Sequence, residues 1–228
     1  MYAFIKRFLD IVVSATVLLV LLPFFIPIIV ALRLTAEGEI FYLQERVGFK
    51  NQPFKIWKFA TMLKNSPNML TGSLTVRNDP RVTPIGKYLR ITKINELPQL
   101  INVLIGNMSL VGPRPQMKVD FDVYPGHVRE RIYDIKPGVT GIGSIIFRDE
   151  EKMMSESGMP VKEFYARHIA PYKGELELWY QENMSFITDL ILIFLTVWVI
   201  FFPESSLPFK ILKDLPDPPK PLKDFIKK

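Results

Sequence analysis

The longest apolar stretch of the chain lies near its N-terminus. Residues 11–32 form a run of 22 residues without a charge, bounded by Asp10 and Arg33. As a straight helix at about 1.5 Å per residue, this run would reach roughly 33 Å, which is enough to cross the hydrocarbon of a bilayer. Pro23 and Pro27 lie within it, and each removes a backbone donor and favours a bend. The pattern predicts a retained membrane anchor, and it leaves a spanning helix and a re-entrant helix–break–helix equally open.

A second apolar run extends from Leu190 to Phe202 and is interrupted only by Thr196. It is too short to cross a bilayer as a helix. Trp179 and Trp198, an aromatic before the run and one within it, suit either the headgroup region or a packed core. We expect an interfacial helix, with a core helix as the alternative.

Between these runs, residues 36–183 have an ordinary globular pattern. Apolar and polar residues alternate in Glu39–Leu43 and Phe54–Phe59, which predicts two short strands. Pro-rich turn signals recur through the region and separate short elements. The expected fold class is therefore α+β: a mostly helical domain with a small β element, attached to the N-terminal anchor.

A helix is predicted to begin at Asn95, because Leu97, Leu100, Ile101 and Leu104 follow the spacing of one buried helical face. In that interpretation Asn95 is the N-cap and the next proline lies in the first turn. Free N–H groups at such a start favour an anion, and two basic residues lie just upstream. A capped core helix with solvated basic residues is the plain alternative.

Three segments follow from these patterns. Residues 1–35 are expected to form the membrane anchor, residues 36–202 the catalytic domain with interfacial helices, and residues 203–228 a tail rich in Pro and Lys. The prolines prevent a long helix in the tail, so we expect it to lie along the protein or an anionic membrane surface.

Composition narrows the class of protein. The 228 residues are 48% hydrophobic and 23% charged, which excludes disorder. The net charge of +6 suits phosphorylated substrates, an anionic bilayer or a nucleic acid, but no recognition motif supports nucleic-acid binding. With no cysteine and only His127 and His168, thiolate zinc sites and cysteine nucleophiles are excluded, and Ser-His-Asp chemistry is disfavoured.

Seven short motifs occur in an order that resembles the bacterial sugar transferases, the monotopic phosphoglycosyl transferases. The likeness covers about residues 5–200. The motifs are Lys6-Arg7-Phe8-Leu9-Asp10, Glu45-Arg46-Val47-Gly48, Lys58-Phe59-Ala60-Thr61-Met62, Asn78-Asp79-Pro80-Arg81-Val82-Thr83-Pro84-Ile85-Gly86, Glu96-Leu97-Pro98-Gln99-Leu100, Asn107-Met108-Ser109-Leu110-Val111-Gly112-Pro113-Arg114-Pro115 and Lys136-Pro137-Gly138-Val139-Thr140-Gly141.

The resemblance implies a membrane enzyme that moves a sugar 1-phosphate from a UDP-sugar to a polyprenyl (undecaprenyl) phosphate and releases UMP. This would be the first membrane step of glycan assembly, on the cytoplasmic face of the bacterial inner membrane. The anchor would be re-entrant with its break at Pro23, and Mg²⁺ would be the cofactor. A homodimer is open, and because the first motif begins at Lys6 we expect no additional N-terminal membrane domain.

The resemblance also assigns site residues. Glu96 would hold the metal, and Arg90 and Arg114 would bind phosphate bidentately. Residues of the neighbouring motifs complete the expected substrate-binding set: Pro113, Arg81 and Lys58.

Asn95 departs from the family pattern, because it stands where the family has the aspartate that attacks the β-phosphate. An amide has no anionic oxygen for covalent catalysis. Another carboxylate could attack, with Asp149, Glu150 and Glu151 as candidates; or the carrier phosphate could attack directly; or Asn95 could mark a blocked aspartate. The remaining alternative is a catalytically silent scaffold that binds the nucleotide sugar or the lipid carrier.

Overall fold

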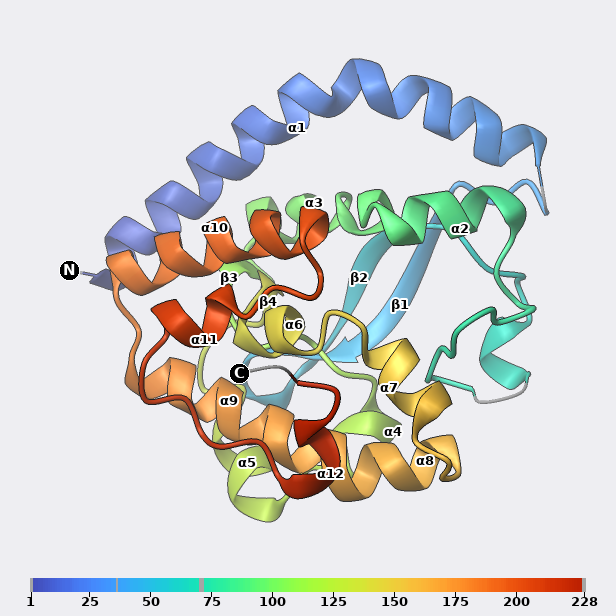
Figure 1. Ribbon diagram of the computed structural model, residues 1–228. Helices are drawn as coiled ribbons and strands as arrows, with labels where there is room; N and C mark the ends of the chain where they lie inside the picture. The colour runs from blue at the N-terminus through green and yellow to red at the C-terminus, as the bar shows by residue number, and fades with distance from the viewer. Residues whose placement is uncertain (1, 36, 70–71, 227–228) are drawn as a thin grey trace.

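The computed structural model describes residues 2–35, 37–69 and 72–226. A long N-terminal helix arches over one side of a mostly helical domain, and the described residues include two small two-stranded sheets (Figure 1). This arrangement agrees with the predicted mixture of helices and a small β element.

Helix α1, Tyr2–Leu34, is continuous although Pro23 and Pro27 lie inside it. The expected helix–break–helix is therefore wrong in one respect: α1 bends near its middle, but it does not separate into two helices (Figure 1). Each proline removes one N–H and crowds the preceding turn, whereas residues on either side keep their bonds. Within the described part of the chain, α1 is the one helix that is both long and apolar enough to cross a bilayer, and most of its surface is exposed.

The first arm of α1 is fixed to the domain by polar contacts. Arg7 donates to the carbonyl oxygens of Val103 (2.6 Å) and Leu104 (3.0 Å) at the end of α3. The buried carboxylate of Asp10 accepts a hydrogen bond from the backbone N–H of Leu110 at 3.0 Å. A cation on the terminal carbonyls of a helix is also favoured by the helix dipole.

The second arm of α1 docks through apolar packing. Phe25 and Leu32 form a small core with Phe59 and Leu89, and the rings of Phe25 and Phe59 meet edge to face at 5.2 Å. Both arms of α1 thus contact the same domain.

The strands predicted near residues 39–43 and 54–59 are confirmed as an antiparallel hairpin. β1, Phe41–Val47, pairs with β2, Pro53–Phe59, in a register that places Phe41 opposite Phe59. A second pair was not predicted: β3, Ser109–Val111, runs parallel to β4, Gly138–Thr140. Strands of three residues carry too little alternation to be recognised from sequence.

The helix predicted to begin at Asn95 begins later. A 3₁₀ turn occupies Ile94–Glu96, and α3, Gln99–Ile105, follows Pro98 at the N-cap position. The Asn95 side chain makes no capping bond. Lys93, with a φ of 60°, turns the chain sharply just before, so the residues after it tighten into a 3₁₀ turn instead of entering the helix.

Most of the remaining helices enclose the main core, whereas α2 (Pro84–Ile91) contributes Leu89 to the small core beneath α1. A π-helical turn at Tyr165–Ile169 joins α8 to α9. The helices are α2 (Pro84–Ile91), α4 (Lys118–Phe121), α5 (Gly126–Arg131), α6 (Ile142–Ile146), α7 (Glu150–Glu156), α8 (Val161–Phe164), α9 (Ala170–Glu182), α10 (Phe186–Phe201), α11 (Leu207–Ile211) and α12 (Lys220–Lys223), with short 3₁₀ turns at Phe49–Asn51 and Ser66–Asn68.

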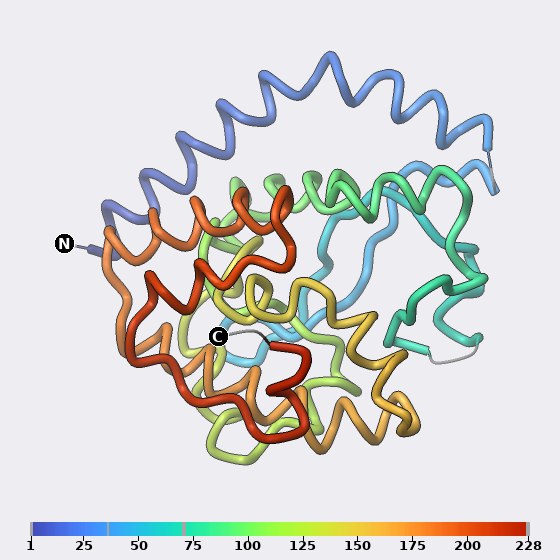
Figure 2. The backbone as a smooth tube through the Cα atoms, viewed as in Figure 1, coloured from blue at the N-terminus to red at the C-terminus, as the bar shows by residue number. Residues whose placement is uncertain are grey.

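The segment after residue 203 contains only short helices, as its prolines predict. It runs back across the domain in front of α9 (Figure 2). Leu212, Leu222 and Ile226 are buried in the main core, and the Tyr172 hydroxyl donates to the carbonyl oxygen of Pro216 at 2.8 Å. The C-terminal segment is therefore part of the packed domain.

Candidate functional site

Three of the predicted site residues lie together: Arg114 and Lys58 both contact Glu96. Arg114 donates to both carboxylate oxygens, with Nη1 at 3.1 Å from Oε2 and Nη2 on Oε1. The Lys58 ammonium lies 3.7 Å from Oε1. All three side chains are largely shielded from solvent, with Lys58 and Glu96 each 14% exposed. A shielded bidentate pair of this kind fixes both partners.

Different elements position these side chains. Lys58 is near the end of β2, Glu96 closes the 3₁₀ turn between α2 and α3, and Arg114 follows β3. Asn102 joins α3 to β2, because its side-chain amide donates to the Lys55 carbonyl at 2.8 Å and accepts from the Trp57 N–H at 2.9 Å.

The surrounding charges keep Glu96 ionised. Burial by itself raises the pKa of this carboxyl, but the charges of Arg114 and Lys58 outweigh it and hold the pKa well below its usual range. Burial also lowers the pKa of Lys58 and of Lys93, and Glu96 opposes that effect in both. Arg46 adds a further, half-buried cation close to Arg114. The cluster has more positive than negative charge, which suits a phosphate-bearing ligand.

The three acidic residues after α6, at positions 149–151, have different surroundings in the structure. Glu151 accepts from Arg90 at 2.6 Å, and Glu150 accepts from Lys173 at 2.6 Å. Asp149, by contrast, is exposed. The two glutamates therefore lie among cations of the site, whereas Asp149 has no comparable surroundings.

Asn95 is buried beside Glu96, and its Oδ1 atom has no hydrogen-bond partner. A buried amide oxygen without a partner is uncommon and costs stability. An amide has no anionic oxygen, so Asn95 cannot act as a carboxylate nucleophile.

Two of the predicted substrate-binding residues, Arg81 and Pro113, are buried and bond to neighbouring segments of the chain. The Arg81 side chain is fully buried; it pairs with Asp79 at 2.6 Å and donates to carbonyl oxygens of the preceding loop, those of Ser66, Met69, Gly72 and Leu74. Pro113 is buried, and its carbonyl accepts from the Gly138 N–H at 2.9 Å. Arg81 therefore braces a loop, and Pro113 joins β3 to β4.

The side chains of this cluster could hold a magnesium ion only if a bound substrate supplied further oxygen ligands. Across residues 2–35, 37–69 and 72–226, no group of three acidic, His or Cys side chains is arranged to hold a metal. Mg²⁺, however, is commonly held by one or two carboxylates together with substrate phosphates and water. Glu96 is the carboxylate of the cluster that would hold the ion in such a shared site.

Sequence reasoning did not identify Lys173 or Glu177, two charged residues on α9. Glu177 is 1% exposed, and desolvation raises the pKa of its carboxyl to about 7. The available signal was their spacing: two opposite charges four residues apart in a helix that is otherwise apolar on that face.

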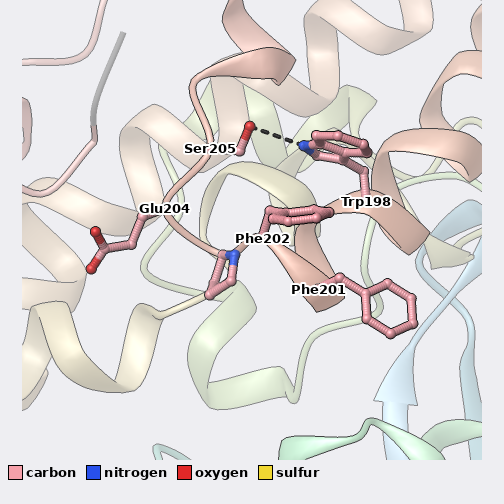
Figure 3. A pocket seen from close by; sticks show the side chains of 6 residues that line it. Trp198, Phe201, Phe202, Glu204 and Ser205 are labelled. Atoms are coloured by element: carbon pink, nitrogen blue, oxygen red, sulfur yellow. Dashed lines mark hydrogen bonds between the residues drawn. The ribbon is translucent and has the colours of Figure 1, made fainter.

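A separate open hollow lies at the end of α10 (Figure 3). Its walls are Trp198 and the residues from Phe201 to Ser205, and the Trp198 Nε1–H donates to the Ser205 hydroxyl at 2.9 Å. Its lining is mainly apolar and contributes none of the predicted site residues.

Comparison with known proteins gives a family match and several named relatives. Residues 1–203 match the family described as bacterial sugar transferase. The chain is 34% identical over 206 residues to a UDP-glucose:undecaprenyl-phosphate glucose-1-phosphate transferase of Klebsiella pneumoniae, covering 88% of this chain and 41% of that protein. It is 32% identical over 203 residues to a UDP-N-acetylgalactosamine-undecaprenyl-phosphate N-acetylgalactosaminephosphotransferase of Aeromonas hydrophila, covering 87% of this chain and 44% of that protein.

A shorter relative is covered more completely. The exopolysaccharide production protein ExoY of Rhizobium meliloti is 30% identical over 219 residues, covering 88% of this chain and 87% of that protein. The chain thus spans less than half the length of the first two relatives and most of the third.

Proposed function

Because the chain belongs to the bacterial sugar transferase family, we propose that it transfers a sugar 1-phosphate from a UDP-sugar to undecaprenyl phosphate and releases UMP. The names of the relatives support this reaction class, with UDP-glucose as one donor among them. The step would initiate glycan assembly on a lipid carrier.

The observation that carries this proposal is the position of the charged cluster next to the apolar side of the molecule. Glu96 lies between α2 and α3, and α1 packs on both of these helices. Exposed apolar side chains continue over α1 and the outer face of α10. A carrier whose phosphate lies at the headgroups and a soluble nucleotide sugar can meet only at such a boundary.

We assign the chemistry of the site to charge stabilisation. Arg114 and Lys58 are placed to bind the donor diphosphate, and Arg90 a further phosphate oxygen. Bound Mg²⁺ would neutralise charge on the diphosphate, with Glu96 as its protein ligand. Glu96 would hold the metal, and the Arg114 guanidinium, which contacts Glu96 in the structure, would bind phosphate.

We further propose that the carrier phosphate attacks the donor directly. An oxygen of the carrier phosphate would form a bond to the β-phosphorus, and the bond from the β-phosphorus to the bridging oxygen would break, with its electron pair leaving on that oxygen as part of UMP. No protein nucleophile is required, which accommodates Asn95.

Intact-protein mass measurement after UDP-sugar alone should show no adduct in the natural chain and an added sugar phosphate in Asn95→Asp. An adduct on residues 149–151 of the natural chain would overturn direct transfer.

We also propose that α1 enters the inner membrane from the cytoplasmic side and returns to it. The contacts of both arms with one domain support this arrangement. Since the chain has no cysteine, Ala3→Cys and Glu37→Cys can each be labelled alone. A membrane-impermeant maleimide should label neither variant in intact spheroplasts and both after permeabilisation. Labelling of one variant from outside would instead establish a spanning helix.

The reaction is tested with purified protein in nanodiscs containing undecaprenyl phosphate and Mg²⁺. Release of UMP is measured for UDP-glucose, UDP-galactose and UDP-N-acetylgalactosamine, with and without the carrier. Carrier-dependent release supports the proposal. Binding of a UDP-sugar without release would identify a silent scaffold. The homodimer stays a prediction, and light scattering of the same particles tests it.

A further inference from the structure

Helix α9 carries two charged side chains that are almost fully buried. Lys173 is 2% exposed and Glu177 is 1% exposed, and they lie one helical turn apart. Neighbouring side chains of the same helix, such as Leu176 and Tyr180, belong to the main apolar core. Buried charges are rare unless they are paired or have a role that an apolar residue lacks.

Glu177 contacts the backbone that presents Arg114. Its Oε1 atom accepts from the Arg114 N–H at 3.4 Å, while Oε2 has no hydrogen-bond partner. The carboxylate also lies against α6, because a Cβ atom on Gly143 would be only 2.5 Å from Oε1. Gly143 therefore leaves room for this carboxylate between α6 and the Arg114 loop.

Lys173 contacts the other side of the site. Its ammonium lies 2.6 Å from Glu150 in the first turn of α7, and the next residue, Glu151, holds Arg90 at 2.6 Å. One face of α9 thus touches both the loop that carries Arg114 and the turn that holds Arg90. These are the two arginines to which the phosphate-binding role is assigned.

We propose that Glu177 and Lys173 are positioning residues, which hold Arg114 and Arg90 at the spacing needed to bind the donor diphosphate. The proposal rests on the transferase function above. Neither residue is expected to touch the substrate. Burying these two charges costs folding free energy. Precise placement of the arginines offsets that cost in function, because a displacement of about 1 Å can lower turnover by about 10²-fold.

The test compares two replacements of Glu177 of similar size. Glu177→Gln retains an oxygen that can accept from the Arg114 N–H, so donor affinity and kcat should stay within about threefold of the natural chain. Glu177→Leu removes the acceptor, and we expect about tenfold weaker binding of UDP-glucose and at least a tenfold lower kcat. The melting temperature of Glu177→Leu should not fall, because it replaces a buried carboxylate that has an unpartnered oxygen.

Lys173→Met tests the second contact, with Glu175→Gln as the matched control on the exposed side of α9. Lys173→Met should weaken UDP-glucose binding, and the control should change neither binding nor kcat. Loss of binding in Glu177→Leu in step with a lower melting temperature would assign a purely structural role and overturn the proposal. Unchanged binding at an unchanged melting temperature would also overturn it. Binding is measured independently of turnover, so absence of UMP release by the natural chain would count only against the proposed function.

Discussion

Two shielded glutamates of this protein, Glu96 and the fully buried Glu177, have opposite preferences for charge. Arg114 and Lys58 keep Glu96 ionised despite its burial, whereas desolvation dominates at Glu177 and raises the pKa of that carboxyl to about 7. The difference comes from their partners: Glu96 receives a bidentate guanidinium, and Glu177 receives mainly a backbone N–H. Residue type alone does not distinguish the two.

Replacing Glu96 tests the proposed metal and arginine contacts together. Glu96→Gln should lower the rate of UMP release by about 10²- to 10³-fold, because it removes the anionic ligand for Mg²⁺ and leaves Arg114 without its counter-charge. Steady-state assays over a range of Mg²⁺ concentrations measure the effect. Asp149→Asn, an exposed neighbour of the site, serves as the control and should retain activity. Full activity of Glu96→Gln would refute the metal assignment.

The raised pKa of Glu177 predicts a pH-dependent stability. The carboxyl binds its proton more tightly in the folded chain than in the unfolded one, where its pKa is near 4.5. Folding stability should therefore fall as the pH rises from about 4.5 to about 7, by on the order of 3 kcal/mol, and stay level above that range.

The Glu177→Gln variant has no such titration. Its melting temperature should exceed that of the natural chain at pH 8, and the gap should close at pH 5. Parallel pH profiles for the two chains in the same detergent would contradict the assigned shift.

At the scale of elements, α1 is joined to α10 by one carboxylate. Asp189 accepts from the Tyr2 hydroxyl at 2.9 Å, from Lys6 at 2.7 Å and from the Tyr180 hydroxyl at 2.6 Å. All of these contacts converge on a residue that is 8% exposed. The first arm of α1 is therefore held to α10 by this buried network, in addition to the contacts of Arg7 and Asp10 with the domain.

Asp189→Asn should loosen this attachment, with a cost of about 3 kcal/mol because Lys6 loses its partner in a shielded place. Hydrogen exchange of residues 2–10 in nanodiscs should accelerate. Asp134→Asn is the comparison, since Asp134 pairs with Lys50 on the exposed surface and its loss should cost less than about 1 kcal/mol. Equal exchange in both variants would show that the other contacts of the arm, including those of Arg7 and Asp10, hold it without the Asp189 network.

Elements differ in how well the sequence predicted them. The two strands of the β1–β2 hairpin were predicted from the alternation in Glu39–Leu43 and Phe54–Phe59, but their pairing was not. The helix start at Asn95 was misplaced because Asn suits an N-cap and the apolar spacing continues through the 3₁₀ turn. A left-handed Lys93 decided the local geometry, and no sequence rule predicts that conformation for lysine.

At the scale of the whole molecule, the C-terminal segment closes the main core. Leu212, Leu222 and Ile226 are buried against elements far away in the chain, including Phe164 of α8. The family match ends at residue 203, so this closing segment lies beyond the matched region. Stability of the catalytic domain should then depend on residues outside the family pattern.

Leu222→Ala tests that dependence. Leu222 is fully buried, so its truncation should cost about 2–5 kcal/mol and lower the melting temperature of the whole domain. The adjacent exposed residue supplies the control, and Lys223→Ala should leave the melting temperature unchanged. If Leu222→Ala unfolds at the same temperature as the natural chain, the segment does not contribute to the core.

The sequence by itself determined the features that depend on local order. These are the uncharged N-terminal run, the alternation of the hairpin, the absence of cysteine chemistry, and the ordered motifs that contain Glu96 and Arg114. Each of these features can be read from residue types and their order along the chain, and the apolar run and the alternation are short-range patterns.

Only the tertiary structure decided which residues meet. It brought Lys58, Glu96 and Arg114 together from three elements, and it assigned Arg81 to bracing a loop although the residue lies in a family motif. It also directed both arms of α1 and the C-terminal segment onto one domain. The physical reason is that burial and charge pairing depend on contacts between distant parts of the chain, and these have no counterpart in local spacing.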